Sequence, residues 1–239
     1  MAVLIGIFTE GGHQFGMNNF FQVINRVLIA NEGWKVILSG LGKTIEIAFF
    51  AIIIGTVLGC LFALMKISTI RPLRWFANLY TTIIRGIPMV TQLMIFGFVI
   101  FSGKNEIMVA SLAFGINSGA YCTEIFRAGI QGVDKGQMEA GRSLGLSYSQ
   151  TLWKIILPQA IKAVLPTYTS EFIALIKETS VASFIAVTDL TKAGDMIRNA
   201  TYNPWVPLFT VALIYLIMTL GLEKIFSRLE RRLAKSDRS

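Results

Sequence analysis

Charged side chains that interrupt long apolar stretches are the residues of this chain with the most informative chemistry. Arg85, Glu171, Lys177 and Glu178 all fall within such stretches. A charge at the centre of a membrane costs at least a few kcal/mol, so it usually faces a cavity or a partner. A buried carboxylate can bind an ammonium group, and a guanidinium can bind a carboxylate. We therefore treat these residues as candidate binding groups for a charged solute.

The candidate path through the apolar region combines charged and uncharged polar residues. Glu171 lies near the middle of its stretch and Glu178 follows seven residues later, which places both on one helix face. The same groups could instead form structural ion pairs or hydrogen bonds between helices, and the sequence leaves both interpretations open. Glu124 and Arg127, three residues apart, are expected to form a local pair. The candidate path residues are Glu171, Arg85, Asn117, Ser118, Gln92 and Glu178.

Five apolar segments are long enough, or nearly so, to hold these residues within a membrane. A helix needs about 20 residues to cross a hydrocarbon core of roughly 30 Å. The second segment exceeds this length at about 1.5 Å per residue, so we expect it to be tilted, partly interfacial or bent at Pro88. The sequence thus predicts an all-α integral membrane protein with a five-helix transmembrane bundle. The predicted spans are 44–65, 73–101, 107–130, 158–187 and 204–222.

The composition supports a membrane protein over a soluble one. Of the 239 residues, 54% are hydrophobic and 15% are charged, whereas soluble domains carry about 25% charged residues. The formal net charge of +8 could indicate nucleic-acid binding. The basic residues lie between apolar runs, however, which is typical of loops that flank membrane spans. We therefore expect no nucleic-acid partner.

The distribution of Lys and Arg predicts the orientation in the membrane. With five spans and the N-terminus outside, 14 basic residues fall on the inner side and 6 on the outer side. Because basic residues are enriched in cytoplasmic loops, we expect the N-terminus outside and the C-terminus inside. The predicted organisation is an extracytoplasmic segment over 1–38, a transmembrane domain over 39–228 and a cytoplasmic tail over 229–239.

The segment before the first span has the pattern of an amphipathic helix. Its apolar side chains recur at steps of three and four residues, and polar side chains occupy the other face. We expect this helix to lie on the outer membrane surface. The apolar positions are Met17, Phe20, Phe21, Ile24, Val27 and Leu28.

No set of residues has the spacing of a metal site. Cys60 and Cys122 lie apart within apolar segments, and His13 is the only histidine. Neither arrangement has the paired spacing of a zinc site or a disulfide framework. No metal ligands are predicted.

The stretch between the third and fourth spans predicts two short, capped helices. Asp134 with Gln137, and Ser147 with Gln150, have the spacing of capping boxes. Gly145 lies between them and can end the first helix in the left-handed conformation. An ordinary loop would not need two capped helices in 25 residues. We expect a rigid projection at the cytoplasmic side.

This stretch resembles the cytoplasmic signature of the permease subunits of ABC importers. The matching residues are Glu139, Ala140, Gly145, Ile155, Leu157 and Pro158, and Gly141 stands where that signature has a second alanine. Flanking segments are similar to the polar amino-acid subfamily, the histidine- and glutamine-type permeases. Those segments include 85–88, 120–121, 127–130, 158–160 and 177–180. The resemblance covers roughly residues 40–232.

The resemblance implies a transport subunit in the cytoplasmic membrane of a prokaryote. Its short cytoplasmic helix would dock on an ATPase, with Glu139, Ala140, Gly141, Leu144 and Gly145 as the coupling residues. The implied partners are an ATPase dimer, an extracytoplasmic amino-acid-binding protein, a second permease subunit and membrane lipid. The chain lacks the GxxxxGK[ST] loop, so ATP and Mg²⁺ are expected on the ATPase, with no cofactor and no catalytic residue here. An amino-acid substrate would offer its ammonium to Glu171 and its carboxylate to a cation such as Arg85 or to helix N–H groups.

Two other classes of membrane protein agree less well with the sequence. A secondary transporter or channel would also explain the spans and the buried charges, but not the doubly capped loop, and no inverted repeat is visible. An intramembrane enzyme would need a nucleophile with a base, or metal ligands, within its spans. The sequence does not indicate which amino acid is carried or whether the second permease subunit is identical.

Overall fold

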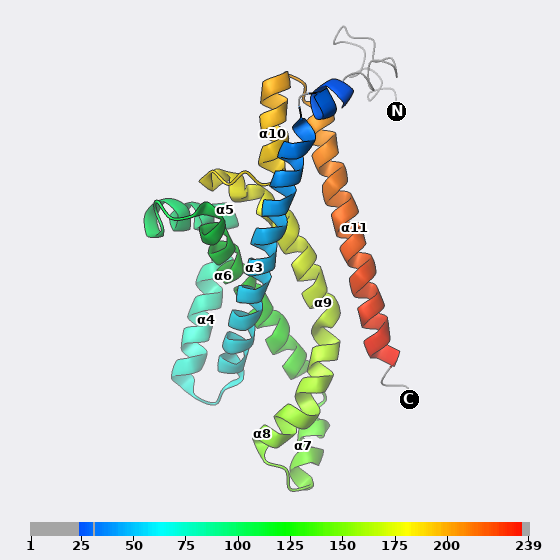
Figure 1. The fold of residues 1–239 in the computed structure, drawn as a ribbon. Helices are drawn as coiled ribbons and strands as arrows, with labels where there is room; N and C mark the ends of the chain where they lie inside the picture. Colours follow the sequence, from blue (N-terminus) through cyan, green and yellow to red (C-terminus); the bar gives the residue numbers. More distant parts are fainter. Residues whose placement is uncertain (1–23, 31, 236–239) are drawn as a thin grey trace, which may run out of the picture.

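The computed structural model describes residues 24–30 and 32–235, and this part of the chain is helical without strands. Two long helices, α3 (Gly33–Ile67) and α11 (Trp205–Lys235), extend along most of the molecule (Figure 1). By length and composition these two could cross a membrane, and a bent pair of shorter helices could form a third crossing. The count of five spans stays a prediction.

The centre of the bundle is the pair formed by α3 and α6 (Glu106–Gly132), which pack along much of their length. Glycines allow this close approach. A Cβ atom on Gly59 would lie 2.5 Å from Cβ of Cys122, and one on Gly115 would lie 2.7 Å from Ile54. Such distances exclude a side chain, so the α3–α6 packing depends on these glycines.

The second predicted span is bent, which decides between the three alternatives raised by its length. α4 (Arg71–Gly86) ends before Pro88, and α5 (Met89–Met94) with the π-helix η2 (Ile95–Ile100) turns away by 102°. The proline has no N–H to continue the helix, and its ring disfavours helical geometry in the residue before it. Of the three alternatives, the structure has the bend at Pro88.

The fourth predicted span is shorter as a regular helix than expected. The short π-helix η3 (Leu152–Ile156) leads into α9 (Leu157–Glu178), and a 3₁₀ segment, η4 (Thr179–Ile185), follows it. α9 also contains Pro166. The α-helix thus ends at 178, although the apolar run continues to 187.

The charged helix α10 (Leu190–Thr201) was not predicted, because its charged residues hide it from a search for apolar runs. It begins at Asp189, whose side chain accepts hydrogen bonds from the backbone N–H groups of Thr191 and Lys192. Lys192 and Arg198 both pair with Asp195, at 3.1 and 2.5 Å. The hydrogen bond from Lys192, with the charge of Arg198, holds the pKa of Asp195 below its ordinary value.

α10 forms a second, smaller core at the N-terminal end of the bundle. The π-helix η1 (Asn25–Ala30) buries Val27 there, next to residues of α3, α10 and α11. The described part of the predicted amphipathic helix therefore packs on the bundle rather than only covering its surface. Positions Met17, Phe20 and Phe21 lie outside the described residues. α3 begins at Gly33, so it runs without a break through the sequence-based boundary at residue 38.

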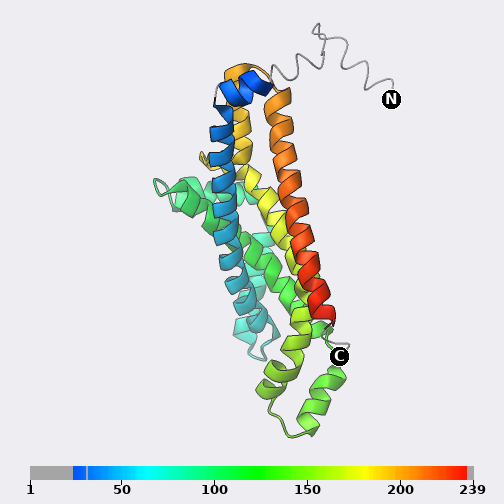
Figure 2. The same ribbon diagram turned by 45° about the vertical axis from the view of Figure 1, so that its right-hand side comes forward.

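The third and fifth predicted spans coincide with α6 and with the first part of α11. The remaining two helices, α7 (Lys135–Ser143) and α8 (Tyr148–Thr151), lie at the end of the molecule away from η1 and α10 (Figure 2).

Candidate functional site

Glu171 lies on α9 where this helix packs against α6. The Ser118 hydroxyl on α6 donates a hydrogen bond of 3.2 Å to Glu171 Oε1, and Ser118 itself is buried. Two predicted path residues from different helices are therefore in direct contact. The carboxylate has one neutral donor and no ion-pair partner among the described residues, so it can accept a further hydrogen bond from a cation.

Arg85 lies in the last turn of α4, close to α6. Its guanidinium lies over the ring of Tyr121, 5.2 Å from the ring centroid. A cation over an aromatic face is attracted by the ring quadrupole. The Arg85 side chain is 44% exposed, and its Nη1 lies 4.0 Å from Glu124 Oε1. The positive charge of Arg85 also interacts electrostatically with the Glu171 carboxylate. Arg85 is thus fixed in position while its cation stays accessible.

Glu124 is the centre of an ion cluster that joins three helices. It binds Lys66 of α3 and Arg127 of α6, the latter at 2.8 Å, and it approaches Arg85 of α4. The predicted local pair of Glu124 with Arg127 is confirmed. Lys66 was not among the predicted site residues, because it lies one residue beyond the predicted span 44–65, although its side chain is only 8% exposed. Three cations around one carboxylate leave an excess of positive charge.

The remaining predicted path residues have separate environments. Gln92 is buried at the bend after α4, where its Nε2 donates to the carbonyl oxygens of Ile84 and Ile87 at 2.6 and 2.7 Å. It therefore caps α4 rather than contacting Glu171. Asn117 is buried on α6 beside Ser118. Glu178 is exposed at the end of α9, two turns from Glu171.

The predicted projection is present, with one difference in its caps. Ser147 and Gln150 form the reciprocal capping box of α8, with hydrogen bonds of 2.8 and 3.2 Å. Asp134 caps α7 by accepting from the N–H of Gly136 at 2.6 Å. The first capping box is not formed, because the Gln137 side chain accepts from Gln159 of α9 instead, at 3.3 Å. Gln137 thus ties α7 to α9.

Gly145 ends α7 as predicted, with φ +83°. The N–H of Leu146 donates to the carbonyl of Gly141 and that of Gly145 to the carbonyl of Arg142, at 3.1 and 3.0 Å. This pattern is a Schellman motif, which requires a left-handed residue that favours glycine. Leu144, next to it, is 81% exposed.

Gly141 has a packing role that the sequence did not reveal. It is the only buried residue of α7, and a Cβ there would lie 2.5 Å from Cγ2 of Thr151. The close approach of α7 and α8 in this chain therefore depends on a glycine at this position. Glu139 and Ala140 are exposed. The projection is therefore compact, with Glu139, Ala140 and Leu144 presented outward.

Comparison with known proteins adds independent information. A family model described as binding-protein-dependent transport system inner membrane component matches residues 51–235. The chain is 40% identical to the arginine transport system permease protein ArtQ of Bacillus subtilis, over 84% of this chain and 94% of that one. It is 34% identical to the glutamate transport system permease protein GluD of Corynebacterium glutamicum, over 94% and 83%. A solved structure described as an amino acid ABC transporter with histidines is 39% identical, with a TM-score of 0.81 over 86% of this chain and 98% of that one.

Proposed function

Because this chain belongs to the family of binding-protein-dependent transport system inner membrane components, we propose that it is the permease subunit of an ATP-driven amino-acid importer. The family is a transport component, so ATP hydrolysis belongs to a separate ATPase. A binding protein delivers the solute. The names of the relatives, which include arginine and glutamate permeases, support an amino-acid substrate.

The contact of Glu171 with Ser118 is the observation that best supports a binding role within the bundle. Within the described part of the chain, Glu171 accepts a hydrogen bond only from a neutral hydroxyl, and a carboxylate in a low-dielectric site gains most from a cation. The ammonium or cationic side chain of an amino acid supplies one. Arg85, over Tyr121 and beside an excess of positive charge, is suited to the substrate carboxylate.

The projection formed by α7 and α8 is suited to dock on the ATPase. Glu139, Ala140 and Leu144 provide exposed contact groups, and the caps of both helices make the projection rigid. α8 continues through η3 into α9, which holds Glu171 about one and a half turns beyond Pro166. A movement imposed on α7 by the ATPase therefore reaches the candidate substrate site through one continuous segment.

The assembly proposed for this chain has two permease subunits, identical or related, with an ATPase dimer below and the binding protein above. It lies in the cytoplasmic membrane of a prokaryote, with the N-terminus outside and the C-terminus inside. The distribution of basic residues in the sequence supports this orientation.

The test is the Glu171→Gln variant in the complex reconstituted with its ATPase and binding protein. The amide keeps the size of the side chain and can still bond to Ser118, so assembly and basal ATP hydrolysis should be retained. Uptake per assembled complex should fall about tenfold or more, and most for a cationic amino acid, since a charge-assisted hydrogen bond is lost. Glu106→Gln, an exposed carboxylate at the start of α6, is the matched control. Unchanged uptake per assembled complex would leave Glu171 with a purely structural role.

A further inference from the structure

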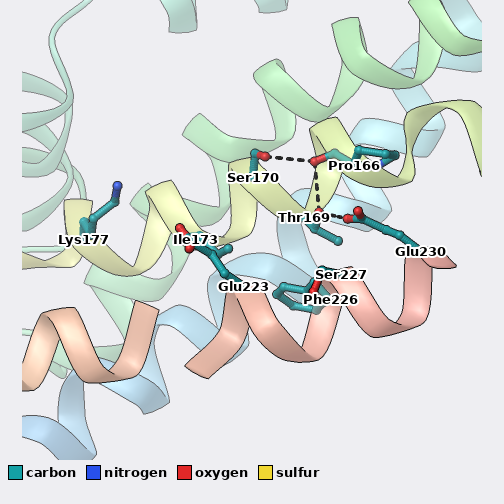
Figure 3. A pocket seen from close by; sticks show the side chains of 9 residues that line it. All are labelled: Pro166, Thr169, Ser170, Ile173, Lys177, Glu223, Phe226, Ser227 and Glu230. Carbon is teal, nitrogen blue, oxygen red and sulfur yellow. Dashed lines mark hydrogen bonds between the residues drawn. The ribbon is translucent and has the colours of Figure 1, made fainter. Parts of the chain in front are cut away.

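A groove lies between α9 and the last part of α11, apart from the candidate substrate path. Its volume is about 410 Å³. Phe172 and Phe226 hold the two helices together beside it, with ring centroids 5.6 Å apart. The lining combines charged, hydroxyl and apolar side chains: Pro166, Thr169, Ser170, Ile173, Lys177, Glu223, Phe226, Ser227 and Glu230 (Figure 3).

Charges of both signs line this groove. Lys177 lies at one end, Glu223 follows, and Glu230 lies at the other end (Figure 3). Glu230 accepts a hydrogen bond of 2.8 Å from the hydroxyl of Thr169. Among the residues that the structure describes, neither Lys177 nor Glu223 has an ion-pair partner. A ligand that carries a cation and an anion would complement both.

The groove begins where α11 changes from apolar to charged. On the turns before Glu223 the large apolar side chains are more than half exposed: Leu213, Leu216, Ile217 and Leu220. From Glu223 onward the helix is mainly charged. Apolar helix surface of this length belongs in hydrocarbon, and charged residues mark the level of the lipid headgroups. On α11 the groove therefore lies beside the headgroup layer, so the α9 residues that line it lie nearer the membrane surface than their place within the predicted span 158–187 implies.

We propose that this groove binds the headgroup of an aminophospholipid, a lipid with a phosphate diester and a primary ammonium. The phosphate bonds to Lys177, the ammonium bonds to Glu223, and the acyl chains lie along the exposed apolar residues of α11. The order of these two charges supports this ligand. Lys177 lies further toward the apolar part of α11 than Glu223 does (Figure 3), as the phosphate lies next to the acyl chains and the amine beyond it.

Other occupants fit these charges less well. An anionic lipid without an amine would place no cation near Glu223. A choline lipid has a cation but no N–H group to donate to this carboxylate. A free amino acid has no acyl chains to cover the exposed residues of α11. Each of these alternatives gives a different experimental result.

The test uses the complex of the permease with its ATPase in lipid nanodiscs that contain equal amounts of phosphatidylethanolamine and phosphatidylcholine. Native mass spectrometry after release from the nanodiscs counts the lipids retained per permease. Phosphatidylethanolamine should be retained preferentially. Glu223→Gln and Lys177→Gln should each reduce this retention, on the order of tenfold for loss of a charge-assisted bond. Lys224→Gln, an exposed cation on the same helix outside the groove, should not.

Three results would overturn the proposal. One is equal retention of the two lipids by the unaltered complex. This measurement does not depend on the folding of any variant. A second is displacement of phosphatidylethanolamine by a free amino acid, which would identify the groove as a solute site. The third is a disulfide between two permease copies through Ser227→Cys, with Cys60 and Cys122 replaced, which would identify it as a subunit contact.

Discussion

Glu124 illustrates how single residues of this protein acquire their roles. Its partner Arg127 is three residues away on the same helix, and helical spacing alone brings the two together. Lys66 and Arg85 come from α3 and α4, so only the packing of three helices places them at the same carboxylate. Lys66 is the least exposed member, which makes it the one that most needs the anion.

We expect the cluster to respond unequally to loss of its members. Glu124→Gln leaves buried Lys66 without a counterion and should destabilise the permease by about 2–4 kcal/mol, somewhat less than for a fully buried pair. Lys66→Met should cost less, because Arg127 and Arg85 still neutralise Glu124. The midpoint of thermal unfolding of the detergent-solubilised protein measures both. The double variant should recover part of the stability lost in Glu124→Gln. Equal losses in the two single variants would contradict the unequal dependence.

At the scale of helices, proline and glycine determine where the elements bend and end. Pro88 turns the second apolar segment by 102°, and the sequence named this residue without choosing the bend over a tilt. Gly145 ends α7 at the predicted position. α10 escaped prediction because its charged residues and its position beyond an apolar run made it look like a loop.

The coupling projection gives a prediction at this scale. Glu139→Lys reverses an exposed charge that has no bonded partner among the described residues. The variant should therefore fold and insert normally, and any loss of partner binding should be confined to docking on the ATPase. Substrate-stimulated ATP hydrolysis in the reconstituted complex should fall at least about tenfold, if Glu139 contacts the ATPase as proposed. Gly145→Val should have a similar effect because its backbone is left-handed, at a cost of about 1–2 kcal/mol. Glu106→Lys is the control charge reversal. Normal stimulation in both α7 variants would exclude this surface as the docking site.

At the scale of the whole molecule, the two ends of the bundle are formed by different helices. The ends of α3 and α11, the start of α4, and α7 with α8 lie toward one end (Figures 1 and 2). η1, α10 and the starts of α3 and α11 lie at the other. Those basic residues of the inner side that the structure describes belong to elements at the first of these ends, so a single insertion direction is consistent with their positions.

Labelling from the two sides of intact cells tests this orientation. In a background without Cys60 and Cys122, Tyr202→Cys should react with a membrane-impermeant maleimide added outside, since Tyr202 is 94% exposed at the α10 end. Leu144 is 81% exposed at the end formed by α7 and α8. Leu144→Cys should therefore react only after the cells are opened. If position 202 were protected from the external maleimide and position 144 were labelled by it, the proposed topology would be contradicted and the opposite orientation supported.

The sequence by itself determined the class of the protein, most of its helices and the capped projection, because these depend on apolar length and on residues within a few positions of one another. It also named Glu171 and Ser118 as separate candidates. Only the tertiary structure decided that these two touch, that Gln92 caps a bend, and that Lys66 and Arg85 meet at Glu124. It also decided that Gly141 admits Thr151 and that Lys177 shares a groove with Glu223. Each of these contacts joins residues from different helices or across a bend, and no periodicity along one segment encodes the distance between two others.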